Sequence, residues 1–73
     1  MKTISRNIGG RVHTIMMDEG QPHLSIDGQH VMVERDGPTT FYSHSTFRSY
    51  SSLDEMAEHI IRFDPKFQTK AQI

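Results

Sequence analysis

The sequence predicts an α+β fold, in which an antiparallel β-meander of four to five strands is covered on one face by a C-terminal amphipathic α-helix. Two observations predict it. Residues 2–50 hold short alternating runs of apolar and polar residues separated by glycine-containing turns, and residues 53–63 carry apolar residues at helical spacing. Several strands followed by one helix are typical of an antiparallel sheet with its helix on one side.

The length of the chain limits it to one small domain. We expect residues 1–73 to form this domain alone. A chain of this size buries only about 60% of the surface that its unfolded form exposes, so its stability is marginal. It has no cysteine, so neither a disulfide nor a cysteine-bound zinc ion reinforces it. A second copy would extend the core, and we therefore expect a homodimer.

The helix is predicted over residues 53–63. Its apolar residues recur at i, i+3, i+4, i+7 and i+8 and form one stripe, which consists of Leu53, Met56, Ala57, Ile60 and Ile61. Ser52 and Glu55 have the spacing of a capping box at the helix start. Pro65 disfavours helical backbone at the residue before it, so the helix should end near residue 63. We expect residues 68–73 to fray.

The first hairpin is predicted from strands at 2–8 and 11–17. Both residues of the Gly9-Gly10 turn between them tolerate the positive φ that two-residue hairpin turns require. This turn sets Ile4 opposite Ile15. Neither face of the hairpin is cleanly apolar, so the sequence leaves its buried face open.

The second hairpin is predicted from strands at 23–26 and 29–35. Asp27-Gly28 between them is a strong signal for a two-residue hairpin turn. Pairing across this turn places four apolar residues on one face, whereas a slip by one residue would scatter them. These four residues are Leu24, Ile26, Val31 and Val33.

A last strand is predicted over residues 39–50, after a turn at Asp36-Gly37-Pro38. A three-residue loop would pair Phe41 with Val33 and place Phe41 in the core. A two-residue loop would send Tyr42 inward instead. Pro38 has no amide hydrogen for a sheet ladder, so we favour the longer loop.

Five histidines in 73 residues raise the question of metal binding, but none of them form an H-x-H or H-x-x-x-H pair. His30 and His44 come close across the third hairpin, with Glu34 beside them, which is one arrangement that could hold zinc. We favour the alternative that these are amphipathic surface residues on a half-exposed sheet. We expect no metal, no cofactor and no small-molecule substrate, and the role of the five histidines stays open.

Catalytic residue patterns are absent from the sequence. Ser43, His44 and Ser45 adjoin one another, but neighbours on a strand point to opposite faces, so adjacency separates a nucleophile from its base. No nucleophile elbow or phosphate-binding glycine loop is present. We expect a protein without enzyme activity.

The sheet face away from the helix is the candidate binding surface. With straight alternation along the last strand, it carries residue types that are enriched at protein–protein interfaces. A protein partner, including a second copy of the chain, is therefore predicted to bind there. The candidate partner-binding residues are Met32, Tyr42, His44, Arg48 and Tyr50.

Two other functions use the same observations. The aromatic residues of this face could stack single-stranded bases, but eight basic residues against nine acidic ones, without a basic run, disfavour nucleic acid. A role as an accessory or inhibitor protein of a mobile element is a further hypothesis, supported only by the small size of the chain and its lack of catalytic residue patterns. The N-terminus lacks the apolar segment of a signal peptide, and no run is long enough to cross a bilayer, so we expect a cytoplasmic protein without membrane contact.

Overall fold

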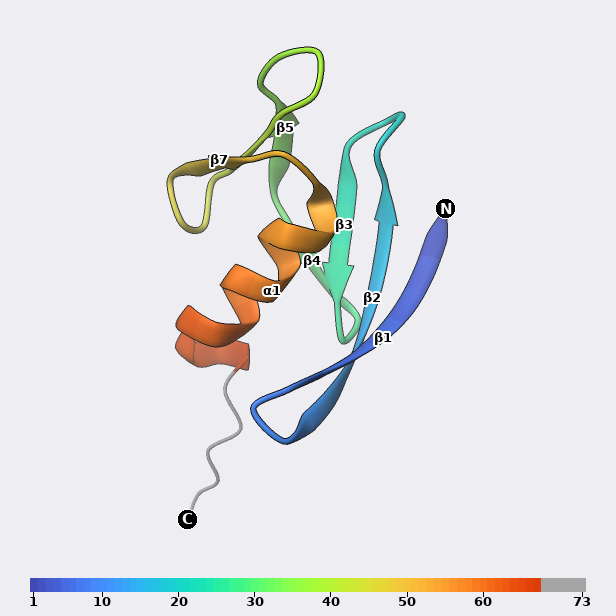
Figure 1. The fold of residues 1–73 in the computed structure, drawn as a ribbon, viewed down its shortest axis with the longest axis vertical. Coiled ribbons are helices and arrows are strands. Elements are labelled where there is room, and N and C mark those ends of the chain that lie inside the picture. The colour runs from blue at the N-terminus through green and yellow to red at the C-terminus, as the bar shows by residue number, and fades with distance from the viewer. Residues whose placement is uncertain (68–73) are drawn as a thin grey trace.

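The computed structural model describes residues 1–67, so the predicted fraying of residues 68–73 lies outside the described residues. The four-stranded antiparallel sheet has the order β1-β2-β3-β4, with β1 Lys2–Ile8, β2 Arg11–Asp18, β3 His23–Ile26 and β4 Gln29–Val31. The three-stranded antiparallel sheet consists of β5 Val33–Arg35, β6 Phe41–Ser43 and β7 Arg48–Tyr50. Helix α1 spans Leu53–Phe63 and lies on one side of the four-stranded sheet (Figure 1), followed by a 3₁₀ turn at Pro65–Phe67. The predicted α+β class is confirmed.

Helix α1 has the predicted bounds, and its start is capped by two chain segments. The Ser52 hydroxyl accepts the amide hydrogen of Glu55 at 3.1 Å. The reciprocal half of the capping box is shifted, because the Glu55 carboxylate accepts from the amide and hydroxyl of Ser51 and not from Ser52. Glu19, in the turn after β2, accepts the amide hydrogen of Leu53 at 3.1 Å. The helix start is therefore tied to the sheet by a hydrogen bond that sequence patterns do not show.

The first hairpin has the predicted register, with Ile4 opposite Ile15, and β2 continues one residue further, to Asp18. The structure also settles which face is buried. Ile15 and Met17 lie against α1, whereas Met16 between them is exposed. Because alternate residues of a strand share a face, His13 is carried into the interior with them.

The second hairpin is confirmed as far as Val31, which pairs with Leu24 across the Asp27-Gly28 turn. The predicted strand 29–35 is wrong beyond that point. Pairing stops at Met32, and Val33 begins a strand of the other sheet. The apolar alternation runs through the break without a change of phase, so the sequence pattern gives no sign that the chain passes between sheets here.

The predicted strand 39–50 is also wrong, because a tight turn divides it into β6 and β7. The Ser43 hydroxyl accepts the amide hydrogens of Ser45 and Thr46, at 3.2 and 3.3 Å. The amide of Phe47 then donates to the Ser43 carbonyl at 2.9 Å, with Phe47 in the left-handed region at φ 58°. Such local side-chain bonds offer the backbone an alternative to a continuous strand.

The connection between β5 and β6 is longer than predicted. Phe41 pairs with Arg35 instead of Val33, so five residues form the loop where two or three were expected. Thr40 closes this loop, since its hydroxyl donates to the Asp36 carbonyl at 2.7 Å and its carbonyl accepts from the Asp36 amide at 2.9 Å. Phe41 is nevertheless buried, as the longer-loop alternative predicted.

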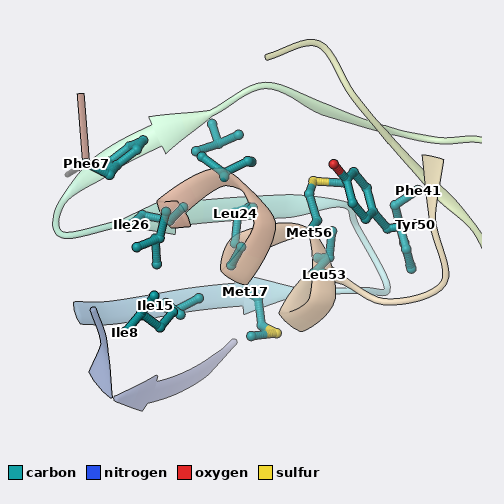
Figure 2. Packing of buried hydrophobic residues seen from close by; sticks show 14 residues of the cluster. Ile8, Ile15, Met17, Leu24, Ile26, Phe41, Tyr50, Leu53, Met56 and Phe67 are labelled. Carbon is teal, nitrogen blue, oxygen red and sulfur yellow. The ribbon is translucent and has the colours of Figure 1, made fainter. Parts of the chain in front are cut away.

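The core is one continuous cluster between α1 and the two sheets. Figure 2 shows Phe67 and Ile26 towards one end of the helix and Tyr50 and Phe41 towards the other. All five residues of the predicted helical stripe are buried. Of the residues predicted for the sheet side of the core, Leu24, Ile26, Val31 and Phe41 are buried and Val33 is partly buried.

Candidate functional site

The four-stranded sheet has a face that turns away from α1, which we name the outer face. The register across its four strands defines the members of this face. One row runs from Thr3 through Met16 and Ser25 to His30. All members are exposed or partly exposed: Thr3, Ser5, Asn7, Val12, Thr14, Met16, Asp18, His23, Ser25 and His30.

The outer face is almost free of charge. Its one charged member, Asp18, lies at the margin, and its carboxylate accepts the amide hydrogens of Gly20 and Gln21 in the following turn. Val12 is 59% exposed and Met16 38% exposed, and Met32, which is 61% exposed, directly follows β4. In an antiparallel sheet with one covered face, apolar residues that point to the core ordinarily alternate along each strand with polar residues that point to solvent. Thr14 separates Val12 from Met16 on β2, so they are single exposed apolar residues, and the feature that this face shares with the centres of protein interfaces is its depletion of charge.

Two histidines lie at the β3–β4 side of the outer face. His23 on β3 and His30 on β4 have ring centroids 5.1 Å apart, with the rings tilted by 43°. They lie diagonally across the β3–β4 pair, because Ser25 is the residue directly opposite His30. The imidazole edges add hydrogen-bonding groups to this surface.

The five residues predicted to bind a partner do not share a face. The turn after Ser43 reverses the alternation, so Tyr42 pairs with Ser49, and Arg48 and Tyr50 fall in the opposite phase. Tyr50 is buried in the core, where its hydroxyl lies 2.7 Å from His59 Nδ1 and 2.9 Å from the Thr46 hydroxyl.

The other four predicted residues, Met32, Tyr42, His44 and Arg48, are exposed or partly exposed but do not lie on one surface. Tyr42 and His44 form an edge-to-face pair with centroids 5.1 Å apart, and His44 Nε2 is 3.4 Å from a carboxylate oxygen of Glu34. Glu34 and Tyr42 lie on β5 and β6 of the small sheet, and His44 lies in the turn between β6 and β7. Met32 lies at the junction of the sheets and is the member closest in sequence to the outer face.

The proposed meeting of His30, His44 and Glu34 is not found. His30 contacts His23 in the four-stranded sheet, whereas His44 contacts Glu34 beside the small sheet. Within residues 1–67, no group of three or more histidine, aspartate or glutamate side chains has the geometry to hold a metal ion.

One histidine has a structural partner that the sequence did not reveal. His13 is 1% exposed, and its Nδ1 lies 2.6 Å from the Asp27 carboxylate. Asp27 also accepts the amide hydrogen of Thr14 at 2.9 Å. Burial acts to raise the pKa of Asp27, but the bonds from Thr14 and His13 and the positive charges of His13 and Arg11 outweigh it and lower this pKa. The β3–β4 turn is thus fastened to β2.

An open hollow of about 490 Å³ lies between the end of β2 and the start of α1. Its acidic lining residues are already used by the fold. Asp18 holds the turn amides, Glu19 caps Leu53, and Asp54 forms an ion pair with Arg6. The second oxygen of Asp54, Oδ1, is buried there without a hydrogen-bond partner, and Lys2 also lines the hollow.

Helix α1 and the 3₁₀ turn, which are the helices of residues 1–67, are both too short to cross a bilayer. Comparisons of the chain with protein-family models, with curated proteins and with solved structures find no match.

Proposed function

We propose that this protein is a non-enzymatic, cytoplasmic interaction module that self-associates and binds a protein partner through the outer face. The observation that carries the proposal is the exposure of Val12 and Met16 in a field of uncharged side chains. Methionine is enriched and charged residues are depleted in the buried centre of protein interfaces. A partner that covers this face would remove apolar surface from water without separating any ion pair.

The distribution of charge in β1 supports this assignment. Lys2 and Arg6 belong to the phase that faces α1, not to the outer phase. Arg6 forms ion pairs with Asp54 and Glu58 of the helix, so its charge is compensated within the chain. The outer phase of the same strand consists of Thr3, Ser5 and Asn7.

A protein partner fits the outer face better than single-stranded nucleic acid does. No lysine or arginine belongs to this face, whereas a groove that follows a phosphate backbone needs several. The strands of the small sheet offer two basic residues, Arg35 and Arg48, and the Arg35 guanidinium lies 5.2 Å from the Phe41 ring centroid and donates to the Glu19 carbonyl.

The test compares two variants that each add one lysine in place of an exposed apolar residue. Val12→Lys changes the outer face, and Phe63→Lys changes the end of α1, where Phe63 is 65% exposed. After circular dichroism has shown that both are folded, each is used to capture partners from an extract of the native host. We expect a saturable partner that wild type and Phe63→Lys retain and Val12→Lys loses. Equal capture by all three chains would place the binding surface elsewhere.

A further inference from the structure

We propose that two copies of this chain pair antiparallel along the free edge of β1, about a two-fold axis at Ser5, and join their four-stranded sheets into one sheet of eight strands. The inference rests on the self-association in the proposed function and specifies its geometry. It uses the strand edge and leaves the outer face free, so loss of one surface does not imply loss of the other.

The hydrogen bonds of β2 show which backbone N–H and C=O groups of β1 point towards β2. Thr14 accepts the Asp27 amide hydrogen at its carbonyl and donates its own amide hydrogen to the Asp27 carboxylate, so both backbone groups of Thr14 point towards β3. Backbone groups alternate in direction along a strand. Those of His13 and Ile15 therefore point towards β1, where their partners are Arg6 and Ile4.

The remaining residues of β1 present their backbone groups to the free edge. If Ile4 and Arg6 point towards β2, then Thr3, Ser5 and Asn7 point the opposite way. Since β1 is the first strand in the sheet order, no strand of the described chain pairs with these groups. They form a row of unpaired donors and acceptors, which is the template that a further strand needs.

The β1 edge is open along its whole length. It spans seven residues, whereas β4 at the other edge of the sheet has only three. Proteins ordinarily blunt exposed edges with proline, a bulge or a charge. β1 contains no proline, its pairing with β2 is continuous over all seven residues, and Arg6 is engaged by the helix, so the charge left to protect this edge is Lys2 at its first residue.

The charges of β1 select a second copy and one register. Pairing about Ser5 sets Lys2 opposite Ile8 of the other copy, Ile4 opposite Arg6, and Thr3 opposite Asn7. No like charges face each other, and the three outward-pointing residues give about six interchain hydrogen bonds. Pairing about Ile4 would oppose Lys2 to Arg6, and pairing about Arg6 would oppose two arginines, which destabilises a strand pair.

Amide hydrogen exchange of the wild-type chain tests the edge directly. We expect light scattering to show a dimer at ~100 µM, about a hundred times a micromolar Kd. In that dimer the amides of Thr3, Ser5 and Asn7 are protected, and they lose protection on dilution, while those of Ile4 and Arg6 stay protected throughout. A monomer at this concentration, or a dimer in which the three outward amides still exchange freely, would overturn the proposal.

A charge exchange at residue 5 tests the symmetry. Ser5→Lys and Ser5→Glu each place like charges opposite one another at the axis, so each alone should dimerise about fivefold more weakly. Their mixture should form a heterodimer at least as stable as the wild-type dimer. Thr14→Lys is the matched control, because Thr14 pairs with Ser5 and lies on the same face but one strand away from the edge. If the mixture associates no better than either variant alone, residue 5 does not meet its copy and the proposal fails.

Discussion

Substitution of two neighbouring residues on β2 should produce very unequal losses of stability. Ile15 is 0% exposed beneath α1, whereas Met16 is 38% exposed on the outer face. Ile15→Ala removes three buried carbon atoms, which are worth about 2.4 kcal/mol at about 0.8 kcal/mol each. The cavity that remains adds to this loss, which places it in the upper part of the range of about 2–5 kcal/mol that such substitutions cost. Met16→Ala opens no enclosed cavity and should cost less than about 1 kcal/mol.

The size of the chain makes this difference easy to measure. At about 0.05–0.15 kcal/mol per residue, a domain of this length unfolds with about 4–11 kcal/mol, so Ile15→Ala removes a large part of the total. The melting temperature should fall by about 10 °C or more for Ile15→Ala and by a few degrees for Met16→Ala. Urea unfolding followed by circular dichroism, at the lowest practical concentration, separates folding from association. Equal losses would refute the assignment of the inner and outer faces.

Three further predictions concern single contacts. Because the pKa of Asp27 is lowered in the fold, its ionised form contributes stability above its unfolded pKa of about 3.9, and this contribution is lost as the pH falls through the folded pKa. In urea titrations below about pH 4, wild type should therefore lose more stability than Asp27→Asn, and parallel curves of stability against pH would contradict this. Phe47 is 75% exposed with φ 58°, so Phe47→Gly should raise the free energy of unfolding by up to about 1 kcal/mol, and a lower melting temperature would show that its ring makes a contact that outweighs the strain. Ser52→Ala removes the helix cap and should cost about 1 kcal/mol in thermal unfolding, whereas an unchanged melting temperature would mean that Glu19 alone caps α1.

The elements that the sequence predicted correctly have signals within a few residues. The stripe from Leu53 to Ile61 and the stop before Pro65 define α1, and the Gly9-Gly10 and Asp27-Gly28 turns define two hairpins. The glycines and Asp27 adopt the positive φ that these turns require. Each signal acts through local backbone geometry, so tertiary contacts had little opportunity to override it.

The errors arise where one local pattern fits two structures. Alternation through Met32 is the same whether the strand continues or crosses to the other sheet. The alternation of residue types around Ser43 is typical of a strand, yet the Ser43 hydroxyl accepts hydrogen bonds from two amides of a turn. The nearby serines were the available signal for this turn. Because this four-residue turn was not predicted, the predicted phase of β7 is inverted, and Tyr50, a predicted interface residue, lies in the core.

The candidate binding face was predictable only in part. The sequence indicated a sheet face away from the helix, but it left open which face of the first hairpin α1 covers. That choice depends on how Ile15 and Met17 meet the helix, and it determines that Val12 and Met16 are exposed. The caps from Glu19 and the bond between His13 and Asp27 join segments that are distant in sequence, and no spacing rule predicts them.

The central claim is that α1 covers one face of the four-stranded sheet and leaves the outer face exposed. Relaxation of side-chain methyl signals by a soluble paramagnetic probe tests it most directly. Because Val12 and Met16 are exposed, we expect strong broadening of their methyl signals, with those of the buried Ile15, Leu24 and Ile60 preserved. Preserved Val12 and Met16 signals beside a broadened Ile15 signal would contradict it, because the helix would then cover the opposite face of the sheet.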